Sequence, residues 1–324
     1  MSLEANLTKG IKVFAGNSNI PLAKKIAKSL GVELSDLVAG KFSDGESTIK
    51  INEMVRGYDV FIIQSTSSPV NDNLMELLII IDALKRASAG RITAIIPYFG
   101  YARQDMTYMP RDPISARLVA DLLYVSGVDR VLSMDIHTTQ IQGFFSCPMD
   151  ILRGNPLYVD YYSKKIKEVE GDFVVVSPSV GAVKRNRALA EALNLPMAII
   201  DNRLHEIDSK RVSTIIGDVK GKNIIMVDDM INTGVSMCNA AADLVENGVV
   251  KVFACCSHPI FAENAVDKIQ ASAIEELVIL DTINQEKYAN VEGFKILSIC
   301  DIFANAIISI HNNQSMSRLY DSLM

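Results

Sequence analysis

The chain has 324 residues, of which 49% are hydrophobic and 22% charged, and its formal net charge is -6. This composition is typical of a globular protein with two domains, and the acidic balance disfavours a dedicated nucleic-acid-binding protein. No apolar run is long enough to span a membrane, and no basic segment followed by an apolar one opens the chain, so we expect a cytoplasmic protein.

The first half of the chain alternates apolar strands with amphipathic helices. Pro21 begins the first predicted helix and Gly31 ends it, while Gly90 ends the second. Strands are predicted at 11–17, 59–65, 91–100 and 130–136, and helices at 21–31, 70–90 and 115–127.

The second half repeats this alternation. Near-continuous apolar strands separated by helices are typical of parallel sheets covered on both faces. The series is too long for one sheet, so we predict an α/β protein with two domains, 1–152 and 153–324, each a mainly parallel sheet flanked by helices. The predicted strands are 172–179, 196–201, 222–229, 251–258 and 276–282, and the predicted helices are 181–194 and 236–248.

Cysteine and histidine are too sparse for a disulfide framework or a metal cluster. The cysteines are odd in number and lack C-x-x-C spacing, so we expect reduced thiols. They are Cys147, Cys238, Cys255, Cys256 and Cys300.

Polar segments follow four of the predicted strands or turns. Open α/β sheets bind ligands at the carboxyl ends of their strands, so these segments are candidate binding loops. They are "GKFSDGE" (40–46), "PYFGYARQD" (97–105), "MDIHTTQ" (134–140) and "MVDDMINTG" (226–234).

The segment 226–234 carries the strongest chemical signal. Asp228 and Asp229 are adjacent after a buried strand, and their repulsion costs free energy unless a cation or a hydroxyl-rich ligand shares them. The following helix start favours an anion, with Gly234 permitting close approach and Thr233 and Ser236 offering hydroxyls. The pattern therefore indicates a site for a phosphorylated sugar. A capped Asx turn is the structural alternative.

The other three segments are weaker signals. Arg103 can pair with a phosphate and Gln104 can bind a base edge, but a surface turn also explains them. The turn around Asp44 is typical of a solvated loop. His137 could bind a metal or a phosphate, although a lone histidine is more often structural.

Taken together, several segments resemble the ribose-phosphate pyrophosphokinases. The resemblance covers nearly the whole chain, and the combination of "STSSPVNDNLMELLI" with "PYFGYARQD" is highly specific to that family. They are "FSDGE", "QSTSSPVNDNLMELLIIIDALKRASA", "IPYFGYARQD", "DIHTTQIQGFF", "VSP", "VENG", "ACCSHPIF" and "SMSRLYD".

The resemblance implies an activity, a fold and partners. The family transfers diphosphate from ATP to ribose 5-phosphate with Mg²⁺, giving phosphoribosyl pyrophosphate and AMP. It has two phosphoribosyltransferase-like domains, with ATP on the N-terminal side and ribose 5-phosphate on the C-terminal side, and it forms dimers and hexamers. No nucleic acid or membrane partner is implied.

Site residues carry over from the family position by position. The ATP residues would be Phe42, Asp44 and Glu46, on a loop lent by a neighbouring subunit, and Arg103, Gln104 and Asp105. His137 would interact with the metal bound to ATP, and Arg203 belongs to the catalytic loop. The ribose 5-phosphate loop would comprise Asp228, Asp229, Asn232, Thr233, Gly234, Val235 and Ser236.

The chain departs from the family where charge matters most. Asn202 stands at the position of the catalytic Lys, Leu204 replaces a second basic residue, and Ser179 replaces a metal-binding Asp. Met106 and Thr107 also replace two basic residues, and Val235 replaces a phosphate-loop Gly. Diphosphoryl transfer depends on preorganised positive charge, so we expect impaired activity.

Two other functions are compatible with these residues. The first is a catalytically inactive paralogue that associates with an active synthetase. The second is a base phosphoribosyltransferase, which would leave the segments 42–46 and 101–105 without a role.

Overall fold

The computed structural model describes residue 8, residues 10–204 and residues 211–316, with only the backbone for 202–204 and 211–212. The chain divides into two compact units after Arg153. The N-terminal unit also contains residues 282–284 and the described residues from 298 onward; the rest forms the C-terminal unit. In the described part of the chain, no helix has the length and apolarity that crossing a membrane requires.

The N-terminal unit contains a five-stranded sheet in the order β1-β4-β5-β6-β7, and every neighbouring pair is parallel. A separate antiparallel hairpin joins β2 to β3. The strands are β1 (Ile11–Ala15), β2 (Leu37–Lys41), β3 (Ser47–Ile51), β4 (Asp59–Ile63), β5 (Arg91–Ile96), β6 (Arg130–Met134) and β7 (Met149–Leu152).

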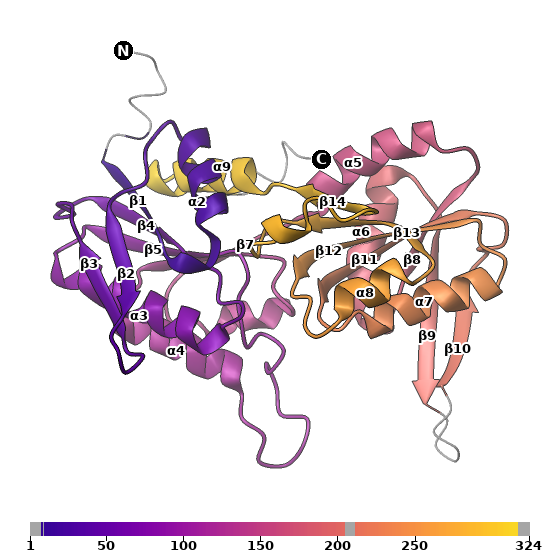
Figure 1. Cartoon of the computed structure of the whole chain (residues 1–324), viewed down its shortest axis with the longest axis horizontal. Helices are drawn as coiled ribbons and strands as arrows, with labels where there is room; N and C mark the ends of the chain where they lie inside the picture. Colours follow the sequence, from indigo (N-terminus) through magenta and orange to yellow (C-terminus); the bar gives the residue numbers. More distant parts are fainter. Residues whose placement is uncertain (1–7, 9, 205–210, 317–324) are drawn as a thin grey trace. The chain divides into compact units, whose positions relative to one another are not determined.

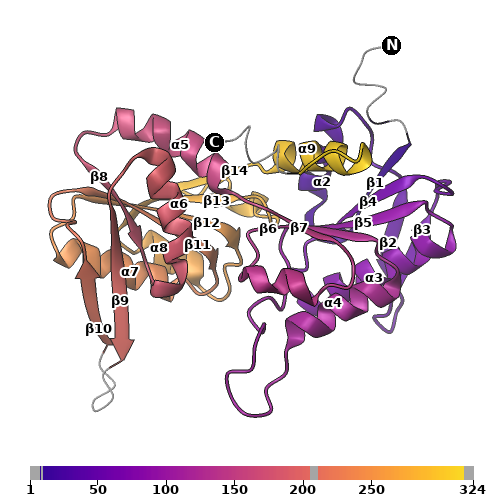
Figure 2. The same cartoon turned by 180° about the vertical axis from the view of Figure 1, so that it is seen from behind.

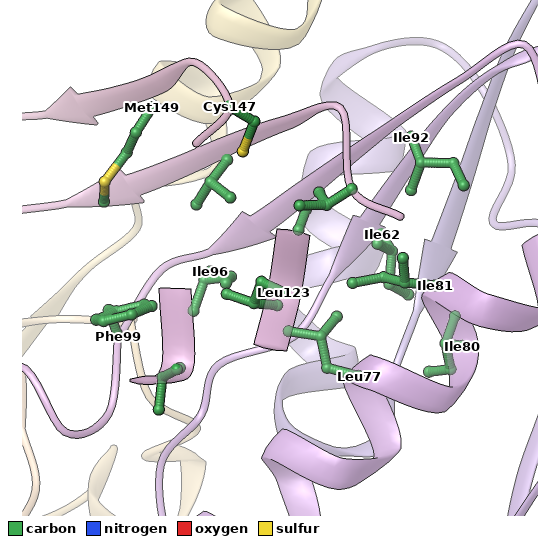
Figure 3. Packing of buried hydrophobic residues seen from close by; sticks show 14 of the residues in the cluster. Ile62, Leu77, Ile80, Ile81, Ile92, Ile96, Phe99, Leu123, Cys147 and Met149 are labelled. Atoms are coloured by element: carbon green, nitrogen blue, oxygen red, sulfur yellow. The ribbon is translucent and has the colours of Figure 1, made fainter. Parts of the chain in front are cut away.

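Helices cover both faces of this sheet (Figure 1). Helices α3 and α4 lie on one face, and α2 and α9 pack together on the other. Figure 3 shows the core under α3 and α4, where Leu77, Ile81 and Leu123 meet Ile62 and Ile96 of the sheet. The helices are α2 (Ile20–Ser29), α3 (Val70–Arg86), α4 (Ser115–Ser126) and α9 (Cys300–His311), with short 3₁₀ helices η1 (Asn17–Asn19) and η2 (Thr139–Phe144).

The C-terminal unit contains a seven-stranded sheet in the order β10-β9-β8-β11-β12-β13-β14. All neighbouring strands are parallel except β9 and β10, which form an antiparallel edge. The strands are β8 (Phe173–Ser177), β9 (Met197–Leu204), β10 (Arg211–Ile216), β11 (Asn223–Ile231), β12 (Lys251–Pro259), β13 (Ile274–Leu280) and β14 (Phe294–Leu297).

This sheet is also covered on both faces, by α5 and α6 on one side and α7 and α8 on the other (Figures 1 and 2). All five residues of β8 are buried, which explains its continuous apolar sequence. The helices are α5 (Asn155–Glu168), α6 (Val183–Leu193), α7 (Val235–Glu246) and α8 (Ala265–Gln270), with 3₁₀ helices η3 (Val180–Ala182) and η4 (Glu286–Tyr288).

The C-terminal segment differs from the predicted domain limits. The first boundary falls at Arg153, next to the predicted position, but residues 298–316 return to the N-terminal unit. The reason is α9, whose buried apolar side packs on α2. Its end is held by His311, whose Nδ1 lies 2.8 Å from Asp59 Oδ2, and by Arg91, which donates to the carbonyl of Ile310 at 3.0 Å.

Candidate functional site

The N-terminal unit joins two of the predicted binding segments at one edge of its sheet. Strands β5 and β6 are parallel neighbours, paired at Ile96 and Ser133, so the segments that follow them share an edge. Asp105 is buried there, and its Oδ2 accepts hydrogen bonds from the Thr138 hydroxyl and, at 3.1 Å, from Gln140 Nε2. Asp105 therefore fixes the first segment to the second.

The ligand-facing groups of this edge surround that buried carboxylate. Arg103 and Gln104 are exposed on one side of Asp105 in the sequence, and half-buried His137 immediately precedes Thr138. The second oxygen of Asp105, Oδ1, is buried without a hydrogen-bond partner. A buried acceptor without a donor is costly, which is a feature of sites that a ligand or ion completes. We call Arg103, Gln104, Asp105, His137, Thr138 and Gln140 the N-terminal cluster.

The predicted loop of Phe42, Asp44 and Glu46 forms the tip of the β2–β3 hairpin. Phe42 N–H donates to the Glu46 carbonyl at 2.8 Å, and Gly45 adopts a φ of +96°, which suits glycine. Phe42 is 58% exposed, an unusually high value for an aromatic residue. Hydrogen bonds anchor the hairpin to α3, through Lys41 and Asp72, and to η1, where Asn17 Nδ2 donates to the Ala39 carbonyl at 3.2 Å.

In the C-terminal unit, Asp228 and Asp229 lie in the second half of β11. Asp229 is buried and Asp228 is partly exposed. Asp229 N–H donates to Asp228 Oδ1 at 2.9 Å, which bends the first carboxylate back over the chain. Arg185 of α6 reaches the pair, with Nη1 3.6 Å from Asp229 Oδ1.

The electrostatics of this pair are incompletely balanced. Burial, and then the neighbouring charge of Asp229, raise the pKa of Asp228 from 3.8 to about 7, whereas Arg185 acts in the opposite direction. At neutral pH the pair therefore holds a proton for part of the time. A bound cation or the hydroxyls of a ligand would stabilise the fully ionised form.

The predicted phosphate loop connects β11 to α7. Asn232 and Thr233 are half-buried, and Gly234 is the residue before the helix, with a φ of +76°. A Cβ at Gly234 would lie 3.4 Å from the Ala265 carbonyl oxygen and from the Ile269 side chain, which is ordinary contact, so the positive φ and not the packing on α8 favours glycine here. Val235 and Ser236 begin the helix with exposed side chains, and the first-turn N–H groups of α7 favour an anion.

Two of the predicted departures from the family pattern lie at the ends of neighbouring strands. Ser179 is exposed after β8, where its carbonyl accepts from the Ser177 hydroxyl at 2.7 Å. The backbone of 202–204 belongs to β9 and pairs with β10. The side chains of Asn202, Arg203 and Leu204 lie outside the described residues, so the catalytic role of Arg203 stays a prediction.

Asp228 and Asp229 fit magnesium binding that is shared with a substrate phosphate, and not binding by a cage of protein ligands alone. Among the residues described, no group of three or more His, Cys, Asp or Glu side chains forms a metal cage. Mg²⁺ usually keeps several waters and is bound by one or two carboxylates together with substrate phosphates. Asp228 and Asp229 fit this substrate-assisted mode.

Three polar residues of these clusters escaped the sequence analysis. Thr138 and Gln140 belong to a predicted segment, but their contact with Asp105 joins positions more than thirty residues apart. Asn186 is fully buried and hydrogen-bonds to β11. Its signal was available, because a polar residue on the apolar side of α6, in line with Leu189 and Ala190, indicates a buried hydrogen bond.

We call Arg185, Asn186, Asp228, Asp229 and the residues 232–236 the C-terminal cluster. Each cluster lies at the carboxyl ends of parallel strands in its own unit. The first offers exposed Arg and Gln side chains beside a histidine, and the second offers paired carboxylates beside a helix N-terminus. The first arrangement suits a nucleotide and the second suits a phosphorylated sugar.

Two family models together match both halves of the chain. The N-terminal domain of ribose phosphate pyrophosphokinase matches residues 11–127, and the phosphoribosyl synthetase-associated domain matches residues 204–321. Ribose-phosphate pyrophosphokinases of Clostridium tetani and Clostridium perfringens are 52% and 51% identical to the chain. Each alignment covers 97% of this chain, with 98% of the first relative and 99% of the second.

A solved structure gives the same result in three dimensions. Phosphoribosylpyrophosphate synthetase from Mycobacterium smegmatis matches with a TM-score of 0.89 at 39% sequence identity, covering 94% of this chain and 100% of that one. The predicted fold class, two α/β domains with mainly parallel sheets flanked by helices, is confirmed. From these matches along nearly its entire length, the chain belongs to the ribose-phosphate pyrophosphokinase family.

Proposed function

We propose that the protein transfers diphosphate from ATP to the 1-hydroxyl of ribose 5-phosphate, producing phosphoribosyl pyrophosphate and AMP, with slow turnover. The relatives at about half identity carry the name ribose-phosphate pyrophosphokinase. Membership of this family makes the protein a transferase of nucleotide biosynthesis. Its compartment would be the cytoplasm, where all five cysteines, which are free, would stay reduced.

The observation that carries the proposal is the carboxylate pair beside the start of α7. Asp228 and Asp229 would accept hydrogen bonds from the vicinal hydroxyls of ribose, and this replaces the proton that Asp228 retains at neutral pH. The N–H groups of Val235 and Ser236, with the Thr233 hydroxyl, would bind the 5-phosphate. One ligand then satisfies both the acidic and the anion-binding parts of the C-terminal cluster.

ATP would bind at the N-terminal cluster. Arg103 would pair with a phosphate and Gln104 with the adenine edge. The hydrogen bond from Thr138 to Asp105 would hold their loop in place. The hairpin tip would complete the site of a neighbouring subunit with Phe42, Asp44 and Glu46, since Phe42 is largely exposed in its own unit.

Magnesium would be held by Asp228 and Asp229 on the sugar side and by His137 near ATP. When bound, it would neutralise charge on the transferred phosphates. The chain's own contribution would be binding and orientation of each substrate by the cluster of its own unit.

Slow turnover follows from charges that the chain lacks. Asn202 and Leu204 carry no charge where the family has two basic residues, and Ser179 carries none where it has a carboxylate for metal. Removing one preorganised electrostatic donor typically lowers turnover by about a hundred- to a thousandfold. Turnover would be lowered further by Met106 and Thr107, which by the resemblance replace two basic residues on the ATP side. It would also be lowered by Val235, which replaces a glycine of the phosphate loop.

Self-association as a dimer or hexamer completes the proposal. Apolar side chains that are 40–75% exposed follow one side of α4 at helical spacing. Such a stripe is larger than the scattered apolar residues of ordinary surfaces, and it suits a subunit interface. The residues are Ile114, Leu118, Leu122 and Val125.

A second candidate is a non-catalytic partner of an active synthetase. Ser179 and Asn202 favour it, since by the resemblance both replace groups required for chemistry, while the exposed apolar stripe on α4 offers a surface for association. Coexpression with an active relative separates the two. Mixed oligomers with altered activity would support the partner role, and their absence would count against it.

The direct test is product detection. Purified protein, ATP, ribose 5-phosphate and Mg²⁺ are incubated, and AMP and phosphoribosyl pyrophosphate are followed by ³¹P NMR and mass spectrometry. We expect both products in equal amounts. Binding of ribose 5-phosphate without products would support the partner role, and absence of both would contradict the proposal.

A further inference from the structure

Asn186 makes an unusual set of contacts from the middle of α6. The side chain is fully buried, yet every polar group is used. Its Oδ1 accepts from Val227 N–H at 3.0 Å, and its Nδ2 donates to the Val227 carbonyl at 2.8 Å and to the Ala182 carbonyl at 2.9 Å. A buried primary amide with all groups satisfied is a specific fixed contact.

The place of these bonds explains their purpose. Pairing of β11 with β8 ends at Met226 and Val176, whereas pairing with β12 continues to Ile231. The N–H and C=O of Val227 would be left buried and unpaired where β8 ends. The side-chain amide of Asn186 supplies the donor and acceptor that a further β8 residue would have given, and it also lies 3.4 Å from Ser177 Oγ at the end of β8.

The next residues of both elements continue this contact. Asp228 follows Val227 directly, and its Oδ1 takes the N–H of Asp229. Arg185 precedes Asn186 and reaches Asp229 at 3.6 Å. Two consecutive residues of α6 therefore contact the two residues of β11 that flank Asp228.

We propose that Asn186 is a positioning residue: it holds the free edge of β11 at Val227 and thereby sets the orientation of the Asp228–Asp229 pair for ribose 5-phosphate. The orienting role rests on the proposed function, whereas the hold on the strand does not. An apolar residue would satisfy the buried side of α6 but would leave the Val227 amide and carbonyl unpaired. Asn186 therefore exchanges some helix propensity for a fixed strand end.

The test compares two ends of the same strand. Asn186→Ala removes the amide, and Asn186→Leu removes it while keeping the side-chain volume. The matched control is Asn223→Ala at the beginning of β11, where Asn223 is also buried and donates to the Glu170 carbonyl at 2.9 Å. All three variants lose a buried amide, but only the first two remove contacts beside the carboxylate pair.

Two measurements are made on the full-length protein. Hydrogen exchange of the amides at 227–231 should become at least about tenfold faster in both Asn186 variants and stay within about twofold in Asn223→Ala. By calorimetry with Mg²⁺ present, the dissociation constant of ribose 5-phosphate should rise at least about tenfold in the Asn186 variants, and that of ATP by less than about threefold.

Each outcome decides a separate point. Unchanged exchange at 227–231 in a folded Asn186 variant would overturn the hold on the strand. Faster exchange with unchanged ribose 5-phosphate affinity would overturn the orienting role. If the wild-type protein binds no ribose 5-phosphate, the proposed function fails, and the exchange comparison still tests the hold on β11.

Discussion

The N-terminal and C-terminal clusters place carboxylates in different electrostatic surroundings. Asp105 receives hydrogen bonds on one oxygen from neutral donors, Thr138 and Gln140, and so holds its own loops together. Asp228 lies beside a second carboxylate, and its pKa rises to about 7. The first arrangement is a structural brace with one acceptor left over, and the second stays electrostatically incomplete until a ligand binds.

The two carboxylate sites therefore differ in their cost to the stability of the fold. The hydrogen bonds to Asp105 hold two loops of the N-terminal unit together, whereas the carboxylate pair costs stability, and under the proposed function that cost is offset when ribose 5-phosphate binds. Under the proposed function, transfer also requires positive charge around the moving phosphates, and the uncharged residues Asn202 and Leu204 would supply none.

The largest effect is expected from restoring charge. Asn202→Lys combined with Leu204→Arg should raise the rate of AMP formation by about a hundredfold or more, because each added cation stabilises charge that develops on the phosphates. A stopped assay with saturating ATP and ribose 5-phosphate measures it. The control, Ile216→Lys with Val250→Arg, adds the same two charges at exposed positions of the same unit. An equal gain in the control would show that net charge, and not its place, is limiting.

The next effect separates binding from stability. Asp228→Asn should weaken ribose 5-phosphate binding by about 10- to 100-fold, since hydrogen bonds to charged groups contribute about 1.5–3 kcal/mol. The same variant should be more stable at pH 8, because it loses the repulsion with Asp229. Calorimetry and urea unfolding measure the two quantities. Asp218→Asn, an exposed carboxylate paired with Lys222, is the control and should change neither. Lower stability of Asp228→Asn would refute the repulsion.

The hydrogen bond from Thr138 to Asp105 gives a change in stability of the opposite sign. Thr138→Val removes a donor to the Asp105 carboxylate, so the free energy of unfolding should fall by about 1.5–3 kcal/mol. ATP binding should weaken by a few-fold at most, because Thr138 acts through Asp105. Exposed Thr139→Val is the neighbouring control. A loss of ribose 5-phosphate affinity in Thr138→Val alone would contradict the separation of the two clusters.

The smallest effect is a pH dependence of stability. Folding raises the pKa of Asp228 from 3.8 to about 7, so between these values the folded protein holds a proton that the unfolded chain has released. This stabilisation is fully present below pH 4 and is lost as the pH rises through 7. Between pH 6 and pH 8 the wild-type protein should lose about 1 kcal/mol relative to Asp228→Asn, measured by urea unfolding at both values. Parallel curves for the two proteins would contradict the raised pKa.

The sequence predicts the positions of chemistry better than the contacts that hold it. Asp228 and Asp229 were predicted because an apolar run ends on two carboxylates, which is a local pattern. The bond from Thr138 to Asp105 and the hold of Asn186 on Val227 join distant segments, and pairing between such segments depends on sheet order. The return of α9 to the N-terminal unit was not predicted for a related reason: the apolar pattern of a helix does not indicate which of two hydrophobic cores it packs against.

The most direct test of the account follows AMP during the first turnover. Wild-type protein is mixed rapidly with saturating ATP, ribose 5-phosphate and Mg²⁺, and the reaction is stopped with acid at intervals. Slow chemistry at the under-charged C-terminal cluster predicts a linear rise of AMP without a burst. A burst close to one AMP per active site would show that transfer is fast and that product release limits turnover, which would contradict the account.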